Sequence, residues 1–231
     1  QALSKMIASV TDSAGRIKIP GLLARVRKLS KAEEKNLKSL RYGENDYRRQ
    51  SGLLAKTKLL GNPKDLLRQV WYQPSFSVNA FQASSRKDCA NIINESAWCH
   101  VGLRIVPDMD PKDSIKRLKA HLLKHAPWGV SVKFAKESAS PAWTTSVDNH
   151  VFKAASEALA KGFGRSTVYM GCGGSIPFVG PFSKVLGGAP ALLIGVEDPY
   201  TNPHSENESL HLGDFNKSIL SAIHLYGELA R

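Results

Sequence analysis

The sequence predicts an α+β domain, in which an antiparallel sheet has helices on one face, followed by the C-terminal part of an α/β domain. The order strand, strand, helix, strand over residues 75–135 indicates the first. The order helix, strand, loop, strand, loop, helix after residue 149 indicates the second. Residues 135–141 are rich in Ser and Ala and are typical of a connector. We therefore place the domains at residues 1–140 and 141–231.

The helices of the first domain are predicted from apolar spacing and capping residues. Apolar positions recur at helical spacing in residues 1–9, and Ser30-Lys31-Ala32-Glu33 forms a capping box for a helix over Lys31–Arg41. A short helix is expected over Lys64–Trp71. Asp110-Pro111 opens a longer helix, because Asp is a favoured N-cap and Pro a favoured first helical residue.

The strands of the first domain are predicted from alternation of apolar and polar residues. Alternation covers Ser75–Gln82, Ser96–Val106 and Gly129–Phe134. Side chains two apart share one face of a strand. In the second strand, one face therefore carries Trp98, His100, Gly102 and Arg104.

The second domain is predicted to be incomplete. Helices are expected over residues 149–161 and Asp214–Leu229, and β-like runs over Ser166–Met170 and Ala191–Val196. Two strands do not make a complete α/β sheet, and the chain opens within a helical pattern at Gln1. We therefore expect that the first half of the second domain belongs to residues preceding this sequence.

The net charge of +12 is concentrated in the first 150 residues. Those residues hold 26 basic and 13 acidic side chains, whereas residues 151–231 hold six and seven. The densest stretch, Arg25–Arg49, lacks interleaved aromatics and a known binding motif. A solvated, mixed-charge surface is the favoured interpretation, and nucleic-acid binding is the less favoured one. No apolar run approaches the roughly 18–20 residues of a membrane helix, so no membrane partner is expected.

The cysteines indicate a reducing compartment, and we expect a cytoplasmic protein. Cys89, Cys99 and Cys172 have no C-x-x-C spacing and cannot all pair within one chain. Cys89 and Cys99 are interpreted as buried, inert thiols. Cys172 lies in a glycine-rich loop without a basic neighbour in sequence.

Two polar loops follow the β-like runs and are the candidate site. Residues 171–177 (GCGGSIP) offer backbone N–H groups and a hydroxyl, and residues 202–208 (NPHSENE) offer an imidazole among carboxylates and amides. Loops just beyond strand ends commonly carry the chemistry of α/β proteins. This pairing favours a metal-assisted hydrolase over a simple binding module.

Each candidate residue also has a plainer interpretation. On its own, His204 is more commonly a structural loop histidine. His121 and His125 have the spacing of a metal pair but no third ligand, so partly exposed helix positions are expected. Ser175 lacks the Gly-x-Ser-x-Gly elbow of a nucleophile, which leaves hydrogen bonding as its role. Arg104 could instead pair with an acid on the sheet.

Four ordered motifs resemble an M20-like dinuclear-zinc metallopeptidase of the aminoacylase/carboxypeptidase type, nearest its carnosinase-like dipeptidase branch. They are residues 15–21 (GRIKIPG), 104–111 (RIVPDMDP), 173–177 (GGSIP) and 204–208 (HSENE). The resemblance covers essentially the whole chain and identifies residues 1–140 as a lid and dimerisation domain that lacks its first strand. It identifies residues 141–231 as the C-terminal remnant of the catalytic domain.

The resemblance implies a hydrolase that cleaves a peptide or N-acyl amide bond next to a free carboxylate. Two zinc ions would activate water and polarise the scissile carbonyl. The general base and most metal ligands would precede Gln1, so no catalytic residue is expected in this chain and the chain alone should be inactive. A homodimer through the lid and the missing N-terminal half would be its partners.

The same resemblance assigns roles to residues of this chain. His204 would be a zinc ligand, and Arg104 would clamp the terminal carboxylate of the substrate. Asn91 would contact substrate, reaching across the dimer. The remaining substrate-binding residues would be Gly173, Gly174 and Ser175. Cys172 stands where many relatives have Glu, and Asn94 where Pro is common, which puts substrate preference or full activity in question.

The main alternative is a non-catalytic dimerisation or binding module. Its association would use the exposed strand edge and the helix over residues 110–124. The two hypotheses differ in whether zinc binds only when the N-terminal half is present.

Overall fold

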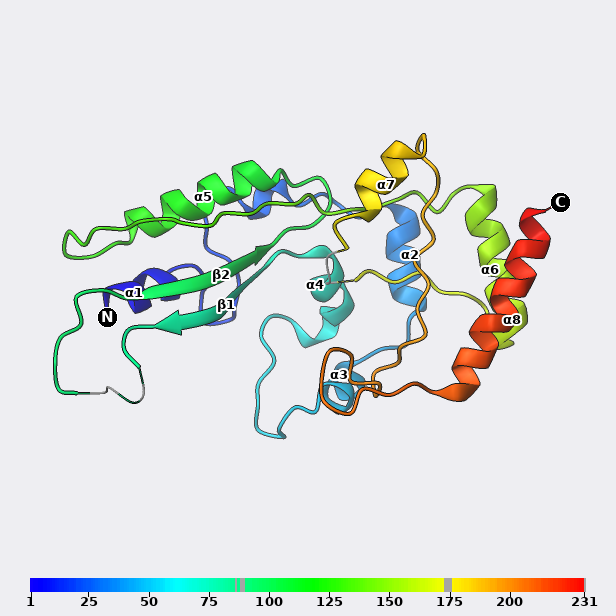
Figure 1. Ribbon diagram of the computed structural model, residues 1–231, viewed down its shortest axis with the longest axis horizontal. Helices are drawn as coiled ribbons and strands as arrows, with labels where there is room; N and C mark the ends of the chain where they lie inside the picture. The colour runs from blue at the N-terminus through cyan, green and yellow to red at the C-terminus, as the bar shows by residue number, and fades with distance from the viewer. Residues whose placement is uncertain (86, 88–89, 173–175, 231) are drawn as a thin grey trace. The chain divides into compact units, whose positions relative to one another are not determined.

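The computed structural model describes residues 1–85, 87, 90–172 and 176–230, which form two compact units (Figure 1). The first unit comprises Gln1–Ser30, Lys58–Ala142 and Gly171–Ser175. The second comprises Lys31–Thr57, Trp143–Met170 and Ile176–Arg231. Residues 31–57, which the sequence groups with the first domain, therefore cluster with the second unit.

The first unit contains helices on one face of a two-stranded antiparallel hairpin. The predicted helices and the first two predicted strands are confirmed within a few residues. The elements are α1 (Ala2–Ala8), η1 (Leu23–Arg25), η2 (Pro63–Asp65), α4 (Leu66–Tyr72), β1 (Ser75–Gln82), β2 (Trp98–Arg104) and α5 (Pro111–Lys124).

The hairpin is interrupted by one irregularity. From Ser75↔Arg104 to Val78↔Val101 the pairing is regular, and it resumes at Ala80↔His100. Asn79 is thus the extra residue of a β-bulge, which leaves two residues of β1 opposite one residue of β2.

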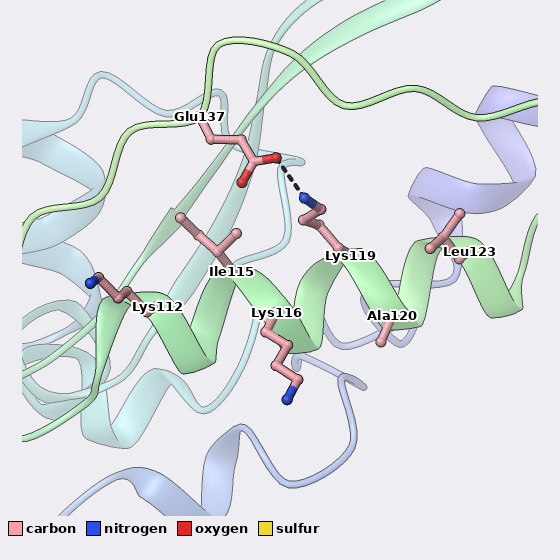
Figure 2. A pocket seen from close by; sticks show the side chains of 7 residues that line it. All are labelled: Lys112, Ile115, Lys116, Lys119, Ala120, Leu123 and Glu137. Carbon is pink, nitrogen blue, oxygen red and sulfur yellow. Dashed lines mark hydrogen bonds and ion pairs between the residues drawn. The ribbon is translucent and has the colours of Figure 1, made fainter.

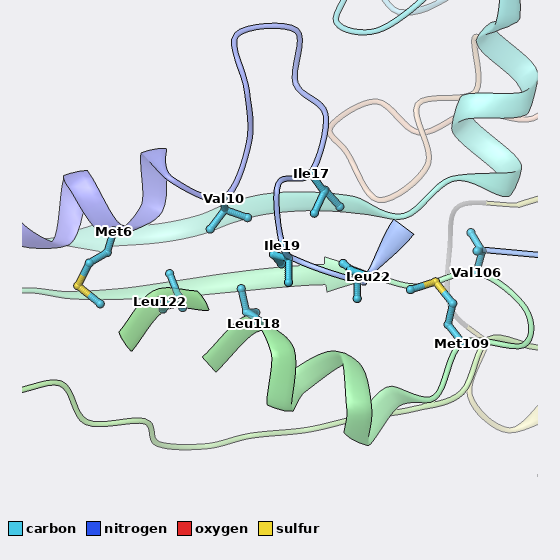
Figure 3. Close-up of a cluster of buried hydrophobic side chains, with 9 residues drawn as sticks. All are labelled: Met6, Val10, Ile17, Ile19, Leu22, Val106, Met109, Leu118 and Leu122. Carbon is cyan, nitrogen blue, oxygen red and sulfur yellow. The ribbon is translucent and has the colours of Figure 1, made fainter. Parts of the chain in front are cut away.

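The core of the first unit lies between this hairpin and the helices α1 and α5 (Figure 3). Phe76, Val101 and Leu103 pack against it from the inner face of the hairpin. Its nine buried members are Met6, Val10, Ile17, Ile19, Leu22, Val106, Met109, Leu118 and Leu122. Burial of such side chains, at roughly 1.5–3 kcal/mol each, is the main stabilising contribution to this unit.

Helix α5 begins as its sequence predicts. The side chain of Asp110 accepts a hydrogen bond from the backbone N–H of Lys112 (2.8 Å), and Pro111 is the first helical residue. This cap satisfies one of the N–H groups that a helix start leaves without an intrahelical partner.

The predicted strand over Gly129–Phe134 is wrong. The segment has no strand partner among the described residues, although the side chains of Val132 and Phe134 do pack against the core. The ammonium of Lys119 lies 4.9 Å from the ring of Phe134, so side chains hold the segment along α5. Alternation predicted the inward positions of Val132 and Phe134 but not the exposure of Val130, and a strand also needs a neighbouring backbone.

The second unit is mostly helical. Its helices are α2 (Lys31–Ser39), α3 (Glu44–Gln50), α6 (His150–Phe163), α7 (Val179–Val185) and α8 (Leu212–Leu229). The sequence predicted α2, α6 and α8, whereas α3 and α7 were not predicted. Helix α6 begins at Asn149, whose side chain accepts from the N–H of Phe152 (3.1 Å). Among the residues described, no helix has both the length and the apolarity needed to cross a bilayer.

The main packing of this unit is between α6 and α8. Gly162 permits a close approach, because a Cβ there would lie 2.7 Å from the backbone oxygen of Lys217. Lys161 and Glu228 form an ion pair across the same contact (2.6 Å).

The two β-like runs of this unit do not form strands, which corrects the sequence prediction. At Tyr169 the side chain of Asn36 replaces a strand neighbour. Its amide donates to the Tyr169 carbonyl (2.6 Å), and its oxygen accepts from the Tyr169 N–H (3.3 Å). Residues 191–196 have no strand partner in the described chain, and Leu193 and Ile194 are about half exposed.

Candidate functional site

Arg104 is the last residue of β2 and lies on the outer face of the hairpin. Its side chain is exposed, whereas its neighbour Leu103 faces the core. Ser75 is its cross-strand partner. A guanidinium here presents a fork of N–H donors that suits a carboxylate.

The outer face of the hairpin next to Arg104 is polar. Gly102 pairs with Ser77, and a Cβ on Gly102 would lie 3.0 Å from the Ser77 hydroxyl oxygen and 3.1 Å from Asn79 Oδ1. Both side chains therefore lean over Gly102. The Ser77 hydroxyl donates to Asn79 Oδ1 (3.4 Å), and His100 continues this face as an exposed residue.

Asn91 lies at the other end of the hairpin from Arg104. It is an exposed residue of the segment 83–97, which joins the end of β1 to the start of β2. Figure 1 shows this connection beyond the end of the hairpin opposite to the one where β2 finishes. The seven residues of β2 span roughly 20 Å, so the structure does not bring Asn91 and Arg104 together.

His204 lies in an exposed, tightly turned loop of the second unit. Its φ of 61° is in the left-handed region, as are those of Asn202 (51°) and Asn207 (58°). The His204 N–H donates to the Glu208 carboxylate (3.3 Å). The loop is anchored at Thr201, which is 2% exposed and whose carbonyl accepts from the Ser209 N–H (2.9 Å).

The glycine-rich loop is described only at its edges. Gly173, Gly174 and Ser175, predicted to bind substrate, lie outside the described residues, as does Cys89. A Cβ on Gly171 would lie 2.6 Å from Cγ of Trp71, so a residue without a side chain is needed there. Cys172 is exposed, and burial raises the pKa of Cys99, in keeping with an inert thiol.

Known proteins resemble this chain over nearly all its length, although no family model matches it. A cysteinylglycine-S-conjugate dipeptidase of Corynebacterium striatum is 27% identical over 214 residues, covering 90% of this chain and 44% of that protein. An M20 family metallo-carboxypeptidase from Sulfolobus solfataricus superposes with a TM-score of 0.83 at 26% identity, covering 97% of this chain and 51% of that one.

The chain is thus similar in sequence and in fold to M20-like metallopeptidases and dipeptidases. Human carnosine dipeptidase 1 has the same fold, with a TM-score of 0.84 at 21% identity over 99% of this chain and 48% of that protein. The chain thus spans about half the length of the relatives it matches.

The M20-like chain does not form a metal centre from its described residues. No three His, Cys, Asp or Glu side chains gather among them. His121 is buried, at 5% exposure, which corrects the expectation of a partly exposed position. Its Nε2 is 3.0 Å from the Ser9 carbonyl oxygen, and its ring stacks on His125 at 4.2 Å, so the pair has a structural role.

A shallow groove of about 460 Å³ on the outer side of α5 contains none of the predicted site residues. Figure 2 shows Lys119 paired with Glu137 (2.6 Å) at its rim, with Ile115 and Leu123 along its length. Its remaining lining residues are Lys112, Lys116 and Ala120.

Sequence reasoning missed Ser77 and Asn79, which lie against Gly102, two residues before Arg104. The alternation of β2 did place His100 and Gly102 on the Arg104 face, and this is confirmed. The strand pairing of this M20-like chain was needed to find the β1 partners, because register is not readable from either strand alone.

Proposed function

We propose that this chain is part of a metal-dependent dipeptidase or carboxypeptidase-like hydrolase that cleaves a peptide or N-acyl amide bond next to a free carboxylate. The observation that carries the proposal is Arg104, an exposed guanidinium on the open face of a rigid hairpin within an M20-like chain. The relatives' names, a dipeptidase and a metallo-carboxypeptidase, support a substrate with a terminal carboxylate.

In this proposal, residues 1–140 act as the lid and dimerisation domain, and residues 141–231 are the C-terminal part of the catalytic domain. The exposed apolar residues of the second unit support the latter role. Val168 is 54% exposed and Met170 is 73% exposed, although both lie in the run Ser166–Met170, whose composition suits a buried sheet. Further residues of the same protein would supply the neighbouring strands and cover these side chains.

The metal would be held mainly by residues outside this sequence. His204 is the proposed ligand from this chain, and two zinc ions are the proposed complement of the whole protein. One exposed imidazole does not hold a metal tightly. The chain alone is therefore expected to be inactive.

Dimerisation is proposed to bring Asn91 to a substrate. Asn91 and Arg104 lie at opposite ends of the same hairpin, which supports roles at two different active sites. Arg104 would serve the active site of its own subunit, and Asn91 that of the partner subunit.

The test is hydrolysis of dipeptides by the protein that contains this chain together with its remaining half, with zinc measured per subunit. Arg104→Lys should raise KM by more than tenfold with a smaller change in kcat, because an ammonium cannot form the bidentate pair. Arg16→Lys, at an exposed arginine of the same unit that pairs with Asp12, is the matched control. Equal KM values for Arg104→Lys and the control would contradict the assignment.

A binding or dimerisation module is the second candidate, supported by the groove on α5. Ile115, Ala120 and Leu123 offer apolar area there. Zinc content measured with and without the remaining half would distinguish the candidates, because the hydrolase should bind zinc only when that half is present, whereas a module should bind none in either preparation.

A further inference from the structure

The outer face of the hairpin contains a donor that no described residue satisfies. Asn79 accepts the Ser77 hydroxyl hydrogen bond on Oδ1, and its amide nitrogen makes no hydrogen bond to the described chain. The bulge leaves Asn79 without a cross-strand partner. Bulges commonly re-aim a side chain beside a site, and here the side chain lies over Gly102.

This donor is near Arg104 along the strand. Gly102 precedes Arg104 by two residues, roughly 7 Å, and both belong to the same face. Gly102 has no side chain, so only backbone atoms of β2 underlie the space between Asn79 and Arg104. A residue whose α-carboxylate is bound by Arg104 can therefore extend its side chain over Gly102 toward Asn79.

The chemistry of this face favours a polar side chain. Ser75, Ser77 and His100 line this face around Gly102, whereas Phe76, Val101 and Leu103 pack against the core. An amide N–H requires an acceptor, and an apolar group placed against it would leave the donor unpaired at a cost.

We propose that Asn79 and Ser77 form the subsite for the side chain of the substrate's C-terminal residue, selecting side chains that end in a carbonyl or carboxylate oxygen. This rests on the proposed function, in which Arg104 binds the terminal carboxylate. The substrate class is then dipeptides ending in Gln, Glu, Asn or Asp. Asn79 is a specificity-determining residue.

The test compares Ala-Gln with Ala-Met, because Gln and Met have similar lengths but only Gln carries an acceptor. In the whole protein we expect kcat/KM for Ala-Gln to exceed that for Ala-Met about five- to tenfold. Asn79→Leu should abolish this ratio while changing kcat/KM for Ala-Met less than twofold. Asn45→Leu, at an exposed asparagine of α3, is the matched control and should leave the ratio unchanged.

A second variant covers the case in which Asn79→Leu does not fold. Asn79→Asp keeps the shape and places a negative charge beside the substrate side chain, so kcat/KM for Ala-Glu should fall at least tenfold relative to Ala-Met. Equal losses for the compared dipeptides, or an unchanged ratio, would overturn the subsite and leave the peptidase assignment standing. If the parent protein hydrolyses none of these dipeptides, the proposed function itself fails, and the subsite with it.

Discussion

The imidazole Nε2 of His121 lies 3.0 Å from the carbonyl oxygen of Ser9, so one hydrogen bond ties α5 to the C-terminal end of α1. A second contact joins the same nitrogen to the Ser9 hydroxyl (3.1 Å). The other ring nitrogen, Nδ1, is buried without a hydrogen-bond partner in the described structure. The ring is therefore held neutral, with its proton on Nε2.

The burial of this ring, which outweighs the opposing effect of the Ser9 hydrogen bond on its pKa, predicts that acid destabilises the first unit. Burial lowers the pKa of His121, and the positive charges of Lys18 and Lys124 and the ring of His125 add to the effect. The unfolded chain, with a His pKa of about 6.5, binds the proton more tightly than the folded chain does. The contribution of His121 is therefore fully present above about pH 6.5 and is lost as pH falls through that value toward the folded pKa.

The measurement is the urea midpoint of unfolding at pH 7.5 and pH 5.5. His121→Gln keeps a side-chain donor but does not titrate, so the drop between the two pH values should shrink. His150→Gln, at an exposed histidine at the start of α6, should leave the drop unchanged. An undiminished drop in His121→Gln would show that other groups cause the acid sensitivity.

A second prediction concerns the amide of Asn36. Because its side chain makes two hydrogen bonds to the backbone of Tyr169, Asn36→Ala should lower the free energy of unfolding by about 1–2 kcal/mol. Asn45→Ala on the exposed surface of α3 should cost under about 0.5 kcal/mol. Chemical unfolding monitored by circular dichroism separates the two, and equal costs would mean that the Asn36 pairing contributes nothing.

A third prediction concerns the exposed apolar residues of α8. Spacings of three and four residues place one stripe on the helix side opposite Ser221, which is buried near α6. The stripe consists of Leu212, Phe215, Ile219, Ile223 and Tyr226. We expect the isolated chain to self-associate through this stripe.

Light scattering at increasing concentration tests this expectation. Ile223→Lys should shift association to at least several-fold higher concentration, because it places a charge in the middle of the stripe. Asn216→Lys adds the same charge to an exposed position of α8 and should have a smaller effect. A chain that stays monomeric at every concentration would contradict the prediction.

The parts of the fold that the sequence predicted are those determined by local chemistry. Asp110 and Asn149 cap their helices through backbone groups two or three residues away, so their roles are readable from the chain. Strands depend on distant partners. The run at Tyr169 has the composition of a strand, but the group that meets its backbone is the side chain of Asn36, 133 residues earlier.

The candidate site also contains residues that local motifs predict and residues that depend on distant strand pairing. Arg104 and His204 were predicted from their motifs, and both are exposed, Arg104 at the end of β2 and His204 in a loop. The role of Asn79 could not be predicted, because alternation in β1 does not reveal a bulge or the residue across from it. Only the pairing of Val78 with Val101 and of Ala80 with His100 identifies the extra residue.

The interleaving of the two units has a consequence for synthesis on the ribosome. Helix α6 packs mainly against α8, which begins about fifty residues after the end of α6 and is therefore synthesised later. Likewise, the hydrogen bond from Asn36 of α2 to the Tyr169 carbonyl forms only after Tyr169 has been synthesised. The second unit therefore folds only when nearly the whole chain has emerged, whereas the core of the first unit can form once α5 is complete. Throughout that interval the nascent chain carries unburied apolar surface, which is the kind of surface that chaperones bind.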